Sequence, residues 1–171
     1  MREALHPVFV ALDFETADYA LDSACAVGLV KAKGDVIIRR ESRLIRPPSR
    51  TFTFTYLHGI EWDDVADKPT FRQLWPEIAG LLDDADFIAA HNSSFDSRVL
   101  YACCRRARLR PPDKRFVCTV KLARRVWGIH PTKLPDVCRH LKIKLAHHKA
   151  LSDAEACARI VMAALRSGVR P

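Results

Sequence analysis

The chain has 171 residues, of which 49% are hydrophobic and 28% charged, with a formal net charge of +8. This length suits one domain with a sizeable core, and the composition excludes a disordered chain. No apolar run approaches the ~20 residues that span a bilayer, and residues 1–7 contain no signal-peptide core. We therefore expect a single domain over residues 1–171, no membrane contact and a cytoplasmic location.

The N-terminal part predicts three strands. Residues 6–13 are rich in β-forming side chains, and residues 24–32 form a second apolar run. Residues 33–35 are a turn signal before a third strand over residues 36–45. Together these segments predict an antiparallel meander, which Pro47 and Pro48 end because proline lacks the N–H that a sheet ladder needs.

The middle of the chain predicts a loop, a helix, a strand and a second helix. Residues 50–68 are expected to be irregular. Thr70 can cap a helix over residues 71–82, in which Pro76 predicts a kink or a later start. Residues 86–91 predict a short buried strand, after which Asn92 or Ser93 caps a helix that runs to about Arg108.

The C-terminal part predicts one strand over residues 116–119 and three helices, over residues 120–127, 135–141 and 150–167. The order β-β-β-α-β-α-β-α-α-α predicts an α/β fold with a mixed sheet whose later strands are parallel. The six cysteines include no Cys-x-x-Cys pair, so we expect free, buried thiols rather than a zinc finger.

Charge is distributed unevenly along the chain. Residues 1–90 carry a net charge of −5 and residues 91–171 a net charge of +13, with nine basic residues and one acid between Arg105 and Arg125. A basic half can attract a polyanion such as a nucleic acid. The alternative is an ordinary solvated helix face.

Three acidic segments stand at the ends of strands or the starts of helices. Asp13 and Glu15 are two residues apart on the first strand and point to one face, where a divalent cation would relieve their repulsion. Asp96 lies in the first turn of one helix, and Asp153 follows His148 into the last helix. Each segment alone has an ordinary explanation, either solvation at a strand end or a favourable interaction with a helix dipole.

In order and context the three segments resemble the Exo I, Exo II and Exo III motifs of the DEDDh 3′–5′ exonucleases, the group of RNase T and the DNA polymerase III epsilon subunit. The matching residues are Asp13-Phe14-Glu15-Thr16, His91-Asn92-Ser93-Ser94-Phe95-Asp96 and His148 to Asp153. The resemblance takes in residues 8–165, including His58-Gly59-Ile60. It implies a ribonuclease H-like exonuclease fold, with a central mixed five-stranded sheet flanked by helices.

The resemblance also implies an activity. It implies a metal-dependent 3′–5′ exonuclease that hydrolyses single-stranded DNA or RNA to nucleoside 5′-monophosphates with two divalent cations, Mg²⁺ or Mn²⁺. His148 is the implied general base, and His147 is the competing candidate. Asp13 would bridge the two ions, Glu15 and Asp153 would share the one that activates water, and Asp96 would lie towards the other.

Substrate contacts are implied at the matching positions Thr16, Leu57, His58 and Asn92. We expect Phe14 and Phe95 to pack within the fold rather than stack on bases. The sequence does not decide whether the substrate is DNA or RNA, and it does not decide the oligomeric state.

The chain ends soon after the last helix, without a polymerase-binding tail. We therefore expect a free-standing enzyme, or one that meets a replication or repair protein through its surface. Two alternatives remain: a weakly active or inactive module that binds nucleic-acid 3′ ends, and an RNA-specific exoribonuclease.

Overall fold

The structure, a computed structural model, describes residues 6–171, which form five strands and seven helices. The predicted absence of a signal-peptide core falls mostly on residues 1–5, which lie outside the described residues. No helix within residues 6–171 is long and apolar enough to cross a membrane. In chain order the elements are β1 (Val8–Thr16), β2 (Ala24–Lys33), β3 (Val36–Leu44), α1 (Thr55–His58), α2 (Trp62–Val65), α3 (Phe71–Leu82), β4 (Phe87–Ala90), α4 (Ser93–Arg106), β5 (Phe116–Cys118), α5 (Thr119–Trp127), α6 (Leu134–Leu141) and α7 (Ala150–Arg166).

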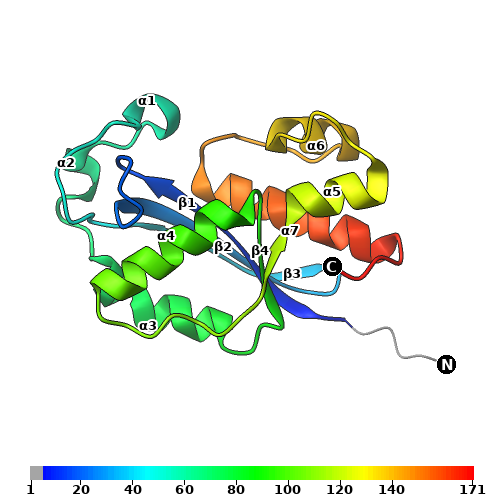
Figure 1. Ribbon diagram of the computed structural model, residues 1–171, viewed down its shortest axis with the longest axis horizontal. Coiled ribbons are helices and arrows are strands. Elements are labelled where there is room, and N and C mark those ends of the chain that lie inside the picture. The colour runs from blue at the N-terminus through cyan, green and yellow to red at the C-terminus, as the bar shows by residue number, and fades with distance from the viewer. Residues whose placement is uncertain (1–5) are drawn as a thin grey trace.

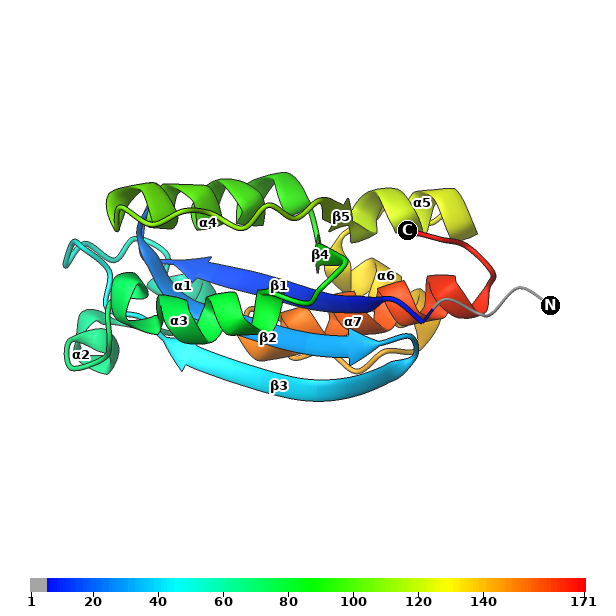
Figure 2. The same cartoon turned by 90° about the horizontal axis from the view of Figure 1, so that it is seen from below.

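The five strands form one mixed sheet in the order β3-β2-β1-β4-β5. β1, β2 and β3 pair antiparallel, and β4 and β5 run parallel to β1. β1 lies at the centre and β3 at one edge (Figure 2). This arrangement confirms the predicted meander and the predicted parallel pairing of the later strands.

Helices cover both faces of the sheet (Figure 1). Side chains alternate between the faces of a strand, so β1 contributes to two cores. Val10 and Leu12 pack in one core with residues of α3 and α4. Phe9 and Ala11 pack in the other with residues of α5, α6 and α7. Asp13 and Glu15 continue the second set and therefore point towards the side of α7.

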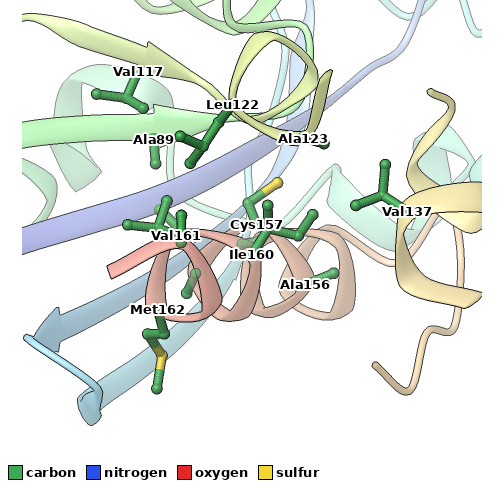
Figure 3. Packing of buried hydrophobic residues seen from close by; sticks show 14 of the residues in the cluster. Ala89, Val117, Leu122, Ala123, Val137, Ala156, Cys157, Ile160, Val161 and Met162 are labelled. Carbon is green, nitrogen blue, oxygen red and sulfur yellow. The ribbon is translucent and has the colours of Figure 1, made fainter. Parts of the chain in front are cut away.

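α7 fills the second core. Its buried side chains include Ile160 and Val161, which point towards Ala89 and Leu122 (Figure 3). The start of α7 comes very close to β2 at Gly28, where an added Cβ would lie 2.2 Å from the carbonyl oxygen of Ala150. Because Gly28 pairs with Asp13, this contact holds the start of α7 beside Asp13.

The loop predicted over residues 50–68 is not wholly irregular, because it contains the short helices α1 and α2. These helices have four residues each, too few to show a helical period in the sequence. α2 is capped at its start, where the Asp64 carboxylate accepts a hydrogen bond from the Glu61 N–H.

The structure decides one predicted alternative for α3 and corrects one bound of β1. α3 begins at Phe71, so the later start predicted from Pro76 is wrong. The Thr70 hydroxyl accepts from the Gln73 N–H, and this cap sets the first turn despite the proline. β1 continues beyond Asp13 to Thr16 because its residues keep pairing with β2. All six cysteines are free, and all except Cys118 are buried.

Candidate active site

Two carboxylates come from β1. Asp13 and Glu15 are both partly buried and lie opposite Gly28 and Ala26 of β2. Their two-residue spacing puts both side chains on the face that α7 covers. A register shift between Glu15 and Thr16 ends the regular pairing with β2. The strand therefore holds both carboxylates beside the start of α7.

The third carboxylate belongs to the first turn of α4. Asn92 adopts a left-handed conformation with φ 60° and ends the turn between β4 and α4. Asp96 is 2% exposed, and its Oδ1 accepts a hydrogen bond from the Phe14 N–H at 3.0 Å. That N–H lies between Asp13 and Glu15 in the chain, so Asp96 is tied to the backbone that carries the first two carboxylates.

The fourth carboxylate, Asp153, belongs to the first turn of α7 and is 3% exposed. Its Oδ2 accepts a hydrogen bond from the His148 N–H at 3.1 Å and contacts Nδ1 of His147 at 2.8 Å. Its Oδ1 is buried and has no hydrogen-bond partner among the described residues. A buried, unpartnered carboxylate oxygen costs free energy unless a donor or a cation compensates it.

Asp13, Glu15 and Asp153 form a compact cluster. Each offers a carboxylate oxygen, and these three atoms all lie within 4.8 Å of one another. Asp96 is not part of that closest group, but its charge acts on Asp13. Oxygen ligands at such separations suit hard divalent cations. Together with the unpartnered Oδ1 of Asp153, the donor set fits a metal ion.

The pKa values of the clustered carboxyl groups are raised. Burial raises the pKa of Asp13 well above its ordinary value, and the neighbouring carboxylates add to the rise. Burial and the charge of Asp153 raise the pKa of Glu15 to about 7, although Lys149 opposes the rise. The pKa of Asp153 is also raised by burial. Like charges in a low-dielectric site disfavour each other's ionised form, and a cation would reverse that preference.

The two adjacent histidines differ in their contacts. The ring of His147 contacts Asp153, whereas His148 reaches Asp153 through its backbone N–H. The two rings stack with centroids 3.8 Å apart. His148 has φ 63°, which turns the chain immediately before α7. Burial and the nearby His147 lower the pKa of His148, which favours its neutral form.

The predicted substrate positions divide into buried and exposed residues. Thr16 and His58 are buried and joined, because His58 Nε2 donates to the Thr16 carbonyl oxygen at 3.1 Å. His58 Nδ1 accepts from the Ile60 N–H at 3.0 Å, so backbone groups occupy both ring nitrogens. Leu57 is 42% exposed and Asn92 is also exposed.

Three more residues, Phe14, Phe95 and Lys149, bear on what the sequence predicts for the site. Phe14 is buried in the core as expected, whereas Phe95 is 37% exposed, so the expected packing of Phe95 is wrong. Phe95 stands at the start of α4, where a helix face turns to solvent. Sequence reasoning missed Lys149, whose ammonium group donates to the His58 carbonyl oxygen at 3.4 Å. A lysine next to the predicted base was the only signal for it.

Comparison with known proteins places this geometry among nucleases. An exonuclease family model, RNase T, matches residues 10–161. The chain is 30% identical over 159 residues to a DNA polymerase III PolC-type of Thermotoga maritima, covering 90% of this chain and 12% of that protein. It is 33% identical over 126 residues to exodeoxyribonuclease 10 of Escherichia coli, covering 68% of this chain and 50% of that protein. The chain therefore spans no more than half the length of these relatives.

Solved structures give the same picture of the fold. The chain matches exonuclease X in complex with 5′ overhanging duplex DNA at 26% identity and a TM-score of 0.77, covering 95% of this chain and 94% of that one. It matches the nuclease domain of 3′hExo bound to rAMP at 21% identity and a TM-score of 0.82, with the same coverage. Both matches confirm the expected ribonuclease H-like exonuclease fold.

Proposed function

The chain belongs to the RNase T exonuclease family as a DEDDh member, and on this premise we propose that it removes nucleoside 5′-monophosphates from the 3′ ends of single-stranded nucleic acid. The observation that carries the proposal is the cluster of Asp13, Glu15 and Asp153, with Asp96 hydrogen-bonded beside it. Four carboxylates from three separate elements meet here, and the carboxylates of Asp96 and Asp153 are buried. Bringing these charges together lowers the stability of the fold. Such a cost is typical of an active site.

We propose that the four carboxylates hold two divalent cations, Mg²⁺ or Mn²⁺, as cofactors. The unpartnered Oδ1 of Asp153 and the raised pKa values of the cluster favour a cation there. When bound, such ions supply Lewis-acid activation of a water molecule and stabilise the leaving 3′ oxygen. The residues proposed to hold them are Asp13, Glu15, Asp96 and Asp153.

We assign the general base to His148. A neutral imidazole can take the proton of the attacking water, and His148 stands at the edge of the cluster. Asp153 holds this segment in place through the His148 N–H and the His147 ring. In this assignment His147 orients the segment, because Asp153 and the stacked ring of His148 restrict its imidazole.

DNA is the substrate that we favour. Three relatives between 26% and 33% identical are named as a DNA polymerase III, an exodeoxyribonuclease and an exonuclease in complex with DNA. The PolC-type match also makes a replication or repair protein in the cytoplasm the partner that we propose. Exposed Leu57 and Asn92, with the backbone around Thr16 and His58, are the proposed contacts of the terminal nucleotide.

The deciding experiment uses 5′-labelled single-stranded DNA and RNA of one sequence, incubated with Mg²⁺, with Mn²⁺ or with EDTA. We expect a ladder that shortens from the 3′ end, that needs the metal and that forms faster on DNA. A faster ladder on RNA would make the protein an exoribonuclease. Binding of 3′ ends without any ladder would make it a binding module and would overturn the proposed function.

Substitution of the histidines tests the assignment of the base. His148→Ala should lower turnover by about 10²–10⁴-fold, the usual contribution of a general base. His147→Ala should cost less, and His140→Ala, at an exposed position on α6, serves as the matched control. If His147→Ala proved the more damaging of the two, the base would be His147.

A further inference from the structure

A groove of about 1030 Å³ runs along α7, beside the segment that connects α6 to α7. One wall is formed by residues 141–146 of the connection. The other is formed by α7 residues from Leu151 to Arg166. The groove lies outside the carboxylate cluster, and neither the motifs nor the proposed chemistry assigns it a role.

The groove is strongly cationic. Its lining includes one acid, Glu155, which Arg40 of β3 binds at 2.8 Å and Arg159 binds at 2.6 Å. This acid is therefore already neutralised by the protein's own side chains. The basic residues of the lining are Lys142, Lys144, Lys149, Arg159 and Arg166. A surface with this charge suits a polyanion.

One end of the groove adjoins the active site. Lys149 lines the groove and also donates to the His58 carbonyl oxygen. Ser152, the residue before Asp153, accepts a hydrogen bond from the Ala146 N–H at 2.8 Å through its hydroxyl group. This bond ties the wall of the groove to the start of α7. A strand whose 3′ end reached Asp153 would meet this end of the groove first.

The basic run between Arg105 and Arg125 holds both engaged and unpaired cations. In that run Arg106 pairs with Asp22 at 3.3 Å and Lys114 donates to a backbone carbonyl at 2.7 Å, whereas Arg105 and Arg110 make no side-chain hydrogen bond or ion pair within residues 6–171. The side chains of Lys142, Lys144 and Arg166 make no hydrogen bond or ion pair within residues 6–171. They are available to a ligand, and they line the groove that adjoins the active site. Partly exposed apolar groups of the lining, such as Leu145 and Leu151, can pack against sugars and bases.

We propose that this groove binds the phosphate backbone of the nucleic-acid strand that extends from the 3′ end in the active site. The proposal rests on the proposed function, because it places the strand end at Asp153. Binding of a backbone through lysine and arginine releases counterions, so affinity falls with salt in proportion to the number of phosphate contacts.

The test compares two triple variants with equal loss of charge. The groove variant is Lys142→Gln, Lys144→Gln and Arg166→Gln. The matched control is Arg105→Gln, Arg108→Gln and Arg110→Gln. Each triple includes one position in the left-handed conformation, Lys142 in the groove and Arg108 in the control, so backbone effects are matched as well. Circular dichroism verifies that both variants fold.

Affinity for a long fluorescent oligothymidylate is measured against salt in EDTA, where no hydrolysis occurs. Because each contact to a single strand contributes about 0.7 to the slope of log K against log salt, the groove variant should lower that slope by about 2. The control should leave the slope unchanged.

An unchanged slope in the groove variant, or an equal fall in the control, would overturn the proposal. Binding of a polyglutamate probe in the first case would assign the groove to an acidic protein partner. The outcome is independent of the metal-dependent ladder. A metal-dependent ladder without a change of salt slope would overturn only the proposed role of the groove. A change of salt slope without a ladder would overturn only the proposed exonuclease activity.

Discussion

The substitution Glu15→Gln should stabilise the metal-free protein at pH 8. The Glu15 carboxylate is part of a crowded acidic cluster, and its pKa is raised from 4.5 to about 7. A folded-state pKa above the unfolded value means that ionisation opposes folding. This cost is absent below about pH 4.5, grows as the pH rises towards 7 and is complete above pH 7. Glutamine removes the charge with little change in shape.

The size of the effect follows from the pKa. A rise from 4.5 to about 7 corresponds to about 3 kcal/mol. Glu15 is partly exposed, so solvent screening reduces the expected gain to about 1–2 kcal/mol. For a chain of this length that gain raises the Tm by roughly 3–6 °C. At a pH near 4.5 the wild type and the variant should melt together.

Thermal unfolding in EDTA at low and high pH measures the effect. Glu41→Gln on β3 is the control, because Arg39 and Arg43 lower the pKa of Glu41. The same chemical change should there lower stability at high pH, the opposite sign. If Glu15→Gln destabilised the metal-free protein at pH 8, the carboxylates would not repel one another as the structure indicates.

Three further outcomes are expected. Mg²⁺ or Mn²⁺ at a hundredfold excess over Kd should stabilise the wild type by about 2.7 kcal/mol. Calorimetry should find that Asp153→Asn loses most of this gain. A full gain in the variant would exclude Asp153 as a metal ligand. Gly28→Ala forces a Cβ against the Ala150 carbonyl and should cost about 1–3 kcal/mol in urea unfolding. Gly80→Ala, in α3 with no atom within 4 Å of the new Cβ, should instead add about 1 kcal/mol, so equal shifts would contradict the close packing at β2. Thr70→Ala removes a helix cap and should cost about 1 kcal/mol, and a neutral result would mean that α3 does not need it.

Regular elements were predictable because their signals are local. A run of β-formers between turn residues identified β2 and β3, and a helical period identified α3 and α7. Prediction failed where the period is too short to read, at α1 and α2. At Pro76 the alternative of a later helix start was wrong, because the cap at Thr70 starts α3 at Phe71 as the apolar period predicts. A first-turn cap stabilises the start of a helix even when one later backbone hydrogen bond is lost.

The candidate site was predictable in its residues and less so in its contacts. Asp13, Glu15, Asp96 and Asp153 followed from motif order and from a family resemblance, and three of them do form a compact cluster. Spacing could not show that the His147 ring, rather than that of His148, contacts Asp153. Both rings precede α7 by a similar distance, and only the turn of the backbone decides which one contacts Asp153.

The sequence by itself determined the order of the longer elements, the acidic residues proposed to hold the metal ions and the excess of basic charge in the second half. These are properties of local periodicity and side-chain type. Tertiary structure alone decided how distant segments meet. Asp96 bonds the Phe14 N–H across 82 positions of the chain, and Gly28 admits the start of α7. It also decided that the unpaired cations Lys142, Lys144 and Arg166 line one groove beside the active site, because that depends on how α7 and the segment before it pack together.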